Sequence, residues 1–246
     1  MKKVANCLPS FFLPYYNNSM SPELKEFQRL VSIFKQHGYI LYLVGGTVRD
    51  LLLGLKLTDM DCVTDATPEE MKLFLKGADF TFAKMGSIRC KEEEVKFDIT
   101  TLRKEKGYAD SRHPNEVIFV KDLKVDVLRR DFTINALYMD EHLMLFDYVN
   151  GEKDIKKRII RMVGDPEKRI KEDPLRIIRA IRFALQLDFE IDKKLEKAMI
   201  KNIDTLKLLK KEKIIQDINK LTKFDENRKK ELFDKFGITK LISVVE

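Results

Sequence analysis

The chain has 246 residues, a length that allows one large domain or two modest ones with a sizeable core and excludes a peptide-sized or disulfide-stapled fold. Hydrophobic residues make up 44% and charged residues 35%, which excludes a disordered polymer, and no run approaches the ~20 apolar residues of a membrane helix. The net charge of +7 belongs to the second part of the chain, because residues 151–246 hold 26 Lys and Arg against 18 Asp and Glu, whereas residues 1–150 hold 21 against 22.

The cysteines and the N-terminal stretch both bear on the cellular location. Cys7, Cys62 and Cys90 are an odd number without CxxC spacing, which favours reduced thiols in a cytosolic protein over a disulfide or a zinc cluster. The apolar stretch at the N-terminus is short, is interrupted by Pro9 and Pro14 and lacks a small-residue cleavage pattern. We therefore expect no signal peptide and a cytoplasmic protein.

The first predicted elements are a helix, a strand, a glycine turn and a second helix. A serine N-cap followed by proline begins an amphipathic helix over residues 22–35. The apolar run 40–44 predicts a strand that leads into the turn Gly45-Gly46, and a short helix is expected over residues 47–53.

The remaining elements of the first half are mostly strands. Residues 59–63 predict a strand, and Thr67 with Glu70 forms a capping box for the helix that follows. Further strands are expected at residues 80–83, 87–90, 95–102 and 116–120. With a hairpin at residues 137–149, these elements predict that residues 1–150 form an α+β domain with a mixed sheet.

From about residue 151 the pattern becomes almost wholly helical. Only two glycines, Gly164 and Gly237, occur beyond Gly151. We expect residues 151–246 to form a helical domain. Its positive charge is explained equally well by lysine-rich solvated helices and by a surface that binds a polyanion.

The most informative carboxylates lie in predicted strands. Asp59 and Asp61 alternate, so both project from one face while Met60 points into the core. Two such carboxylates can hold Mg²⁺, whose other ligands are typically substrate phosphates and water. Asp98 is a third acidic strand position, flanked by apolar residues. Burying three like charges is costly unless cations neutralise them, so the pattern is consistent with a metal site.

A turn suited to phosphate precedes these carboxylates. Gly45-Gly46 has no side chains that would block backbone N–H groups from phosphate oxygens. Arg49 follows within the next turn of helix, where it meets either a triphosphate or the carboxylate of Asp50.

Asp173 and Arg176 form a pair that could read a base. They are three residues apart on a predicted helix and are therefore neighbours on one face. The carboxylate can accept a hydrogen from the exocyclic amine of C or A, and the guanidinium can donate to the adjacent ring nitrogen. U and G would leave buried groups unpaired at ~1–3 kcal/mol each, so the pair could select C and A without a template. The alternative is an ordinary surface ion pair.

Four motifs occur in a characteristic order. They are GGTVRDLLLG at 45–54 followed by DMD at 59–61, RRDFTINA at 129–136, an Asp-Gly-Arg element within 147–158, and EDPLRIIRAIRF at 172–183. Together they resemble the polymerase-β-type nucleotidyltransferases, and within them the class II tRNA nucleotidyltransferase (CCA-adding) and bacterial poly(A) polymerase group.

The resemblance implies a nucleotidyltransferase head over residues 1–150 followed by an all-helical neck over 151–246. It implies an enzyme that adds C and/or A from CTP and ATP to the 3′ end of tRNA and releases pyrophosphate by a two-metal mechanism with Mg²⁺. The catalytic residues would be Asp59, Asp61 and Asp98, of which Asp59 and Asp61 hold the metal. The nucleotide-binding residues would be Gly45, Gly46, Arg49, Arg130, Asp131, Asn135, Asp173, Arg176 and Arg179.

Two alternatives and two departures accompany this reading. A poly(A) polymerase fits the same motifs, as does a head-neck RNA-binding subunit of a split enzyme. Relatives continue through helical body and tail regions, so we expect a truncated RNA-binding body here and tRNA docking that involves a partner subunit or a second copy. Relatives that add the terminal A carry a flexible loop at the position of residues 103–114, and this chain keeps a segment of that kind. The alternative is that residues 103–114 are an ordinary solvated hairpin loop. One substitution also departs from the family pattern: Asp188 stands where relatives usually have glycine.

Overall fold

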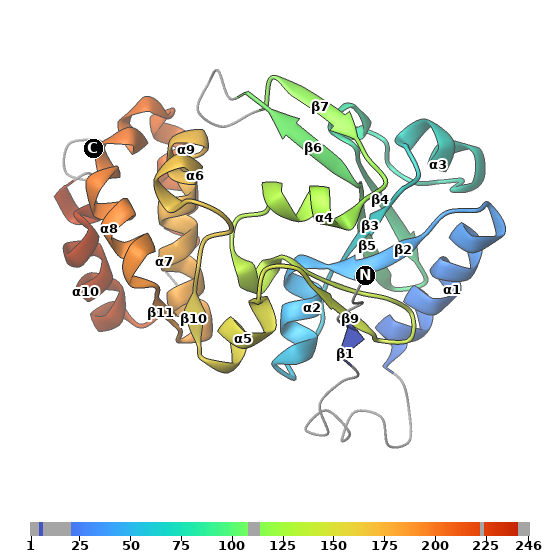
Figure 1. The fold of residues 1–246 in the computed structure, drawn as a ribbon, viewed down its shortest axis with the longest axis horizontal. Coiled ribbons are helices and arrows are strands. Elements are labelled where there is room, and N and C mark those ends of the chain that lie inside the picture. Colours follow the sequence, from blue (N-terminus) through green and yellow to red (C-terminus); the bar gives the residue numbers. More distant parts are fainter. Residues whose placement is uncertain (1–4, 7–20, 108–113, 222–223, 241–246) are drawn as a thin grey trace. The chain divides into compact units, whose positions relative to one another are not determined.

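The structure is a computed structural model that divides into two compact units (Figure 1). The residues that it describes are 5–6, 21–107, 114–221 and 224–240. Unit 1 comprises residues 1–105, 117–130 and 134–152. Unit 2 comprises residues 106–116, 131–133 and 153–246.

A seven-stranded sheet forms the core of unit 1, in the order β1-β9-β8-β2-β3-β5-β4. The strands are β1 (Ala5–Asn6), β2 (Leu41–Val44), β3 (Met60–Thr64), β4 (Ser87–Glu92), β5 (Val95–Thr101), β8 (Leu137–Met139) and β9 (Leu145–Asp147). β3 and β5 run parallel and the other neighbouring strands run antiparallel. The sheet is therefore mixed, which confirms the predicted α+β class.

Helices flank this sheet because their apolar faces need a partner. They are α1 (Pro22–Gln36), α2 (Gly45–Leu52), α3 (Pro68–Phe74) and α4 (Leu123–Asp126). α1 contacts β2 and β5, whereas α2 contacts β2, β3 and β8. The hydroxyl of Ser21 caps α1, and Thr67 with Glu70 forms the predicted capping box of α3. A separate two-stranded sheet pairs β6 (Arg103–Lys106) with β7 (Glu116–Phe119).

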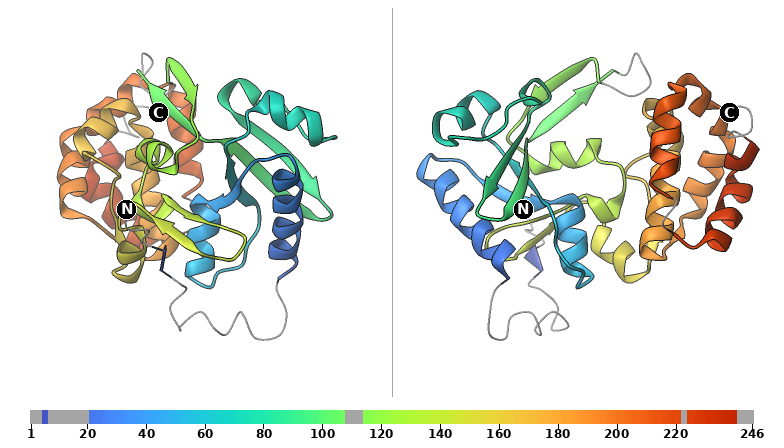
Figure 2. Two further views of the ribbon diagram at one scale, coloured as in Figure 1. Left: turned by 45° about the vertical axis from the view of Figure 1, so that its right-hand side comes forward. Right: turned by 180° about the vertical axis from the view of Figure 1, so that it is seen from behind.

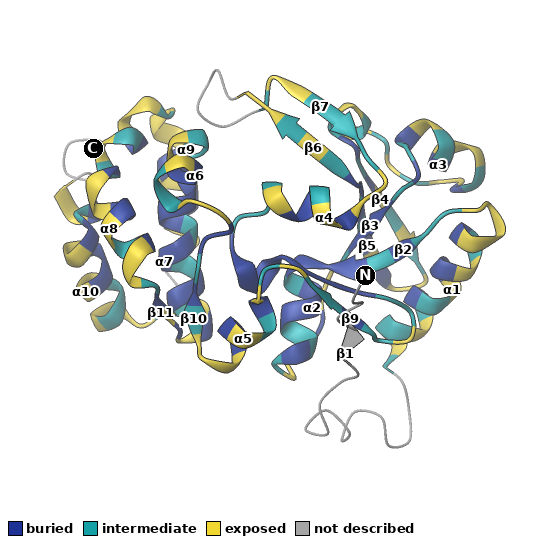
Figure 3. Cartoon of the chain, in the orientation of Figure 1, coloured by how far each residue is buried: buried dark blue, intermediate teal, exposed yellow. Residues whose placement is uncertain are grey.

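Unit 2 is built from helices, as predicted for the second half of the chain (Figure 2). They are α6 (Pro166–Glu172), α7 (Leu175–Leu187), α8 (Lys193–Lys201), α9 (Lys211–Asn219) and α10 (Glu226–Phe236). α5 (Gly151–Lys156) spans the division between the units. α7 is buried along most of its length (Figure 3) and contacts α6, α9 and α10. A short parallel pair, β10 (Ile159–Ile160) and β11 (Glu190–Ile191), is the one addition to the expected all-helical pattern in the described residues.

Several local predictions are wrong. Residues 80–83 form no strand: Asp79 makes an isolated bridge to Arg89, and residues 83–85 form a 3₁₀ turn. α2 begins at Gly45 itself, so no separate glycine turn precedes it. The predicted loop over residues 103–114 begins with β6, and its residues 108–113 lie outside the described residues. Within the described residues, no helix is long and apolar enough to span a membrane.

Candidate functional site

The carboxylates of Asp61 and Asp98 come together because β3 and β5 are parallel neighbours. Their register pairs Asp61 directly with Asp98. Asp59 is exposed and lies just before β3 rather than within it. The buried hydroxyl of Thr47 in α2 accepts the N–H of Asp61 at 2.8 Å and donates to the carbonyl of Asp59 at 3.3 Å. α2 thus fixes the backbone that carries both carboxylates.

The charge of Asp61 is only partly compensated by the protein. Burial, with a further contribution from the charge of Asp98, raises the pKa of Asp61 to about 6. The positive charges of Arg130 and Arg49 and the backbone N–H of Gly46 act in the opposite direction. A carboxylate with a raised pKa, beside a second carboxylate, is a place where a cation would stabilise the ionised form.

The donor set suits a hard cation held by few protein ligands. Among the described residues, no group of three or more His, Cys, Asp or Glu side chains is placed to share one metal ion. Asp98 forms an ion pair with Arg89 at 2.8 Å, a cross-strand contact between β4 and β5 that the sequence analysis missed. The carboxylates of Asp59, Asp61 and Asp98 supply hard oxygen atoms, the donor type that divalent cations such as Ca²⁺ and Mg²⁺ take.

The glycine pair lies against Asp61. Gly45 has φ +67°, a left-handed conformation that favours glycine. A Cβ atom on either Gly45 or Gly46 would lie 3.5 Å from Oδ2 of Asp61. The absence of side chains there keeps the start of α2 open beside the carboxylate.

Arg49 is buried and is held by two side chains of unit 1. It donates to Oδ1 of Asn135 at 2.7 Å and forms an ion pair with Asp50 at 2.7 Å. The pairing with Asp50 that the sequence left open is therefore present. Because Arg49 also acts on the charge of Asp61, the glycine pair, Arg49, Asn135 and Asp61 form one cluster.

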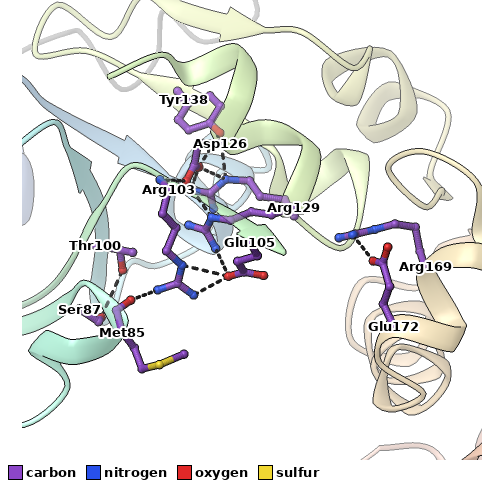
Figure 4. A network of polar contacts seen from close by, with 11 residues as sticks. Met85, Ser87, Thr100, Arg103, Glu105, Asp126, Arg129, Tyr138, Arg169 and Glu172 are labelled. Atoms are coloured by element: carbon purple, nitrogen blue, oxygen red, sulfur yellow. Dashed lines mark hydrogen bonds and ion pairs between the residues drawn. The ribbon is translucent and has the colours of Figure 1, made fainter. Parts of the chain in front are cut away.

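Arg130 reaches the same cluster and is held by a residue that the sequence analysis missed. Asp126, which is 0% exposed, accepts hydrogen bonds from Arg129 and the hydroxyl of Tyr138 (Figure 4). It also accepts a hydrogen bond from Arg130. The positive charge of Arg130 lowers the pKa of Asp61, so the guanidinium acts on that carboxylate. The spacing of Asp126 three and four residues before the two arginines was the available sequence signal.

Asp131 belongs to unit 2 and pairs with Arg179 of α7. Nε of Arg179 donates to Oδ2 of Asp131 at 2.9 Å. Burial opposes ionisation of Asp131, but the charge and hydrogen bonds of Arg179 and the N–H of Phe132 outweigh it and lower the pKa of Asp131 to about 2. Two of the predicted nucleotide-binding residues thus contact each other within unit 2.

Asp173 and Arg176 are close in sequence, but the prediction that both lie on one helix is wrong. Asp173 has an extended backbone between α6 and α7, and its Oδ1 accepts the N–H of Leu175 at 3.1 Å. Arg176 is buried in the first turn of α7. Its guanidinium donates to the carbonyl of Arg169 at 2.6 Å and contacts Glu172 at 3.3 Å.

The predicted site residues therefore fall into two groups, one in each unit. The group of unit 1 consists of Gly45, Gly46, Arg49, Asp59, Asp61, Asp98, Arg130 and Asn135. The group of unit 2 consists of Asp131, Asp173, Arg176 and Arg179.

The sequence of this chain is similar to that of known proteins. Residues 41–161 match the family model of the poly A polymerase head domain. A CCA-adding enzyme of Lactobacillus helveticus is 47% identical over 185 residues, which are 75% of this chain and 46% of that enzyme. A CCA-adding enzyme of Staphylococcus epidermidis is 40% identical over 203 residues, 82% of this chain and 51% of that enzyme. Residues 41–161 belong to the poly A polymerase head-domain family.

Solved structures of this family have the same fold. The CCA-adding enzyme of Bacillus stearothermophilus in complex with CTP is similar with a TM-score of 0.81 and 35% identity, over 89% of this chain and 53% of that one. The Thermotoga maritima CCA-adding enzyme complexed with tRNA is similar with a TM-score of 0.73 and 26% identity, over 93% and 54%. The chain spans about half the length of the curated relatives it matches.

Proposed function

We propose that this protein is a cytoplasmic, template-independent RNA nucleotidyltransferase that adds C and/or A from CTP and ATP to the 3′ end of tRNA and releases pyrophosphate. The observation that carries the proposal is the cluster of unit 1, in which Asp61 lies beside Asp98, the glycine pair, and two arginines. Carboxylates next to phosphate-binding groups are what a transfer between a triphosphate and a hydroxyl requires.

Asp59 and Asp61 would hold Mg²⁺ in this proposal. Their hard oxygen donors support the choice of Mg²⁺. The raised pKa of Asp61 marks a carboxylate whose ionised form a cation would stabilise. Bound Mg²⁺ would supply charge stabilisation at the attacking and leaving oxygens of the in-line displacement. Asp98 would complete the carboxylate set or help take the proton of the attacking 3′-hydroxyl. Because Asp98 is paired with Arg89, its carboxylate would then interact with both Arg89 and the substrate.

The remaining residues of unit 1 would bind the incoming nucleotide. Backbone N–H groups of Gly45 and Gly46 and the guanidinium of Arg49 would contact phosphate oxygens. Arg130 and Asn135 would position the sugar and the triphosphate, because both belong to the cluster around Arg49 and Asp61.

The group of unit 2 would select the base. The carboxylate of Asp173 would accept from the exocyclic amine of C or A, and Arg176 would donate to the neighbouring ring nitrogen. The Leu175 N–H, the Arg169 carbonyl and Glu172 hold these two side chains in place without any nucleic-acid template. Asp131 with Arg179 would help position the sugar.

The second candidate is a poly(A) polymerase, which the description of the matching head-domain model favours. A third reading is an RNA-binding subunit of a split enzyme, in which a partner subunit or a second copy completes the tRNA contacts. These candidates differ in the product that they make.

The experiment is incubation of the protein and Mg²⁺ with tRNA lacking CCA or ending in CC, and with each labelled nucleoside triphosphate in turn. Products are resolved to one nucleotide. We expect incorporation of C and A only, ending at CCA. A long A tail would identify a poly(A) polymerase instead, and RNA binding without incorporation would identify a binding subunit.

A further inference from the structure

Asp126 is a buried carboxylate on which several donors of unit 1 converge. Its Oδ1 accepts Nε of Arg129 at 2.8 Å and the backbone N–H of Arg103 at 3.1 Å. Its Oδ2 accepts the hydroxyl of Tyr138 at 2.9 Å (Figure 4). The same oxygen accepts Nη2 of Arg130 at 2.8 Å. A carboxylate that is 0% exposed requires such partners, because an unpaired buried charge is strongly destabilising.

The charges of Arg129 and Arg130 keep the carboxyl group of Asp126 ionised. Burial alone would raise the pKa of Asp126, but the charges of Arg130 and Arg129 hold it well below its usual range. The same ion pair raises the pKa of Arg130, against the effect of its own burial. One anion therefore faces two permanent cations.

Asp126 and Tyr138 both hold the guanidinium of Arg130. Both Nε and Nη2 of Arg130 donate to Oδ2 of Asp126, at 3.0 and 2.8 Å. Nε also lies 3.0 Å from the hydroxyl of Tyr138, and the guanidinium carbon lies 5.0 Å from the centre of the Tyr138 ring. A planar guanidinium held at two nitrogens and stacked on a ring has little freedom to rotate.

A second carboxylate extends the cluster to β6. Glu105 accepts Nε of Arg103 at 2.9 Å and lies 3.6 Å from Arg129. The guanidinium of Arg103 also donates to the carbonyl of Met85 in the 3₁₀ turn before β4. The start of β6, the end of α4 and the turn before β4 are thus tied to the residues that orient Arg130.

We propose that Asp126 is a positioning residue that orients Arg130 toward the triphosphate of the incoming nucleotide, with the Tyr138 hydroxyl as its second support. This inference rests on the proposed function, since it takes Arg130 as a phosphate-binding group. Its effect should appear in nucleotide binding more than in the chemical step, because Asp126 is bonded to the arginines and not to the metal-binding carboxylates.

The test compares Asp126→Asn and Tyr138→Phe with Asp122→Asn, a matched control at the exposed N-cap of α4. Asparagine caps a helix as well as aspartate does, so the control removes a nearby charge without touching the cluster. CTP affinity is measured by titration, and kcat and KM for CTP by single C addition to tRNA lacking CCA. Circular dichroism melts establish that each variant is folded.

We expect Asp126→Asn to raise Kd and KM for CTP about tenfold, with a smaller change in kcat. Tyr138→Phe should raise Kd and KM about threefold. The control Asp122→Asn should leave Kd and KM within about twofold of the wild-type values. In the Arg130→Gln background, Asp126→Asn should add less than a twofold further effect, because its contribution acts through Arg130. A merely structural role would give no such split between KM and kcat and no such loss of additivity.

A folded Asp126→Asn with wild-type CTP affinity, or effects of Asp126→Asn and Arg130→Gln that multiply independently, would overturn the inference. If Asp126→Asn does not fold, Tyr138→Phe decides: a folded variant within twofold of wild-type Kd overturns the inference, and a threefold rise supports it. A wild-type protein that transfers no nucleotide would contradict the proposed function instead, so the two failures are distinguishable.

Discussion

At the scale of single residues, the fold places Asp61 where its negative charge is only partly compensated by protein groups. Parallel pairing of β3 with β5 fixes Asp98 beside it, and burial adds to the cost of its charge. The nearby N–H of Gly46 and the charges of Arg130 and Arg49 offset that cost only in part. A divalent cation would supply the rest.

The first prediction concerns metal binding without turnover. Mg²⁺ should stabilise the wild-type protein against unfolding, by about 2.7 kcal/mol at a hundredfold excess over Kd. Asp61→Asn should lose most of this stabilisation because it removes a ligand. The measurement is the unfolding midpoint with Mg²⁺ and with a chelator. Glu69→Gln, which changes an exposed carboxylate of α3, is the control, and an equal shift in all three proteins would argue against the site.

The second prediction concerns the pair of Asp131 and Arg179. Because Arg179 lowers the pKa of Asp131 from 3.8 to about 2 despite its burial, the ionised carboxylate stabilises unit 2 above about pH 4. This contribution is lost as the pH falls toward 2. Asp131→Asn should therefore cost about 1–2 kcal/mol at pH 7, a figure reduced because the Arg179 side chain is 37% exposed.

Urea unfolding of wild type and Asp131→Asn at several pH values measures this difference. The gap between the two proteins should narrow as the pH falls below about 4. A gap that stays constant from pH 7 to pH 3 would mean that Asp131 contributes through packing and not through its charge.

Which residue contacts could be foreseen depends on the distance in sequence between the partners. The alternation of Asp59 and Asp61 is a local pattern, but β3 begins at Met60, so the prediction that both carboxylates lie within one strand is wrong. Their joint action stays a prediction. The pairing of Arg89 with Asp98 depends on the register of β4 on β5, which no local pattern specifies. Asp126 was missed because its role needs Tyr138, twelve residues away on β8.

At the scale of elements, the connection between α2 and β3 supports the whole cluster of unit 1. The Thr47 side chain is buried between the two elements and bonds the backbone on both sides of Met60. An element as short as α2 depends on such tertiary contacts for its position.

The third prediction follows from this connection. Thr47→Val keeps the shape but leaves the N–H of Asp61 without that acceptor, so it should destabilise the protein by about 1–3 kcal/mol and slow nucleotide transfer. Thr47→Ser should restore most of both. Urea unfolding and single-turnover transfer measure the two effects, and indistinguishable valine and serine variants would contradict the prediction.

The elements that were predicted correctly carry strong local signals. α1 and α3 have caps and proline at the first turn, which identify a helix start without tertiary information. β6 was missed because its sequence, RKEK, has no apolar alternation and its side chains alternate only between intermediate and exposed. The false strand at 80–83 is aromatic but lacks a partner long enough to form a ladder.

At the scale of the whole molecule, charge and fold separate along the chain. The mixed sheet with its carboxylates belongs to unit 1, whereas the excess of Lys and Arg lies in residues 151–246, most of which form unit 2. Composition predicts a boundary near residue 150, because glycine-poor helical sequence begins there. The two compact units divide at residue 152, but residues 106–116 and 131–133 also belong to unit 2.

The fourth prediction concerns RNA affinity. If the Lys and Arg side chains of residues 151–246 contact phosphates, the Kd for tRNA should rise at least about tenfold between about 50 and 200 mM salt, because each phosphate contact releases counterions. Titration of labelled tRNA at several salt concentrations gives the slope of log affinity against log salt. An affinity that does not change with salt would show that the positive charge is only a solvated surface.

The most direct test of the central claim is single-turnover transfer of one labelled C to tRNA lacking CCA, at saturating Mg²⁺ and CTP, by the wild type, Asp59→Asn, Asp61→Asn and Glu69→Gln. We predict that the wild type and Glu69→Gln extend the tRNA by single nucleotides at the same rate. The two site variants should be slower by roughly a thousandfold while remaining folded, because each loses a preorganised charge at the reacting phosphate. Transfer by Asp61→Asn at the wild-type rate would contradict the account.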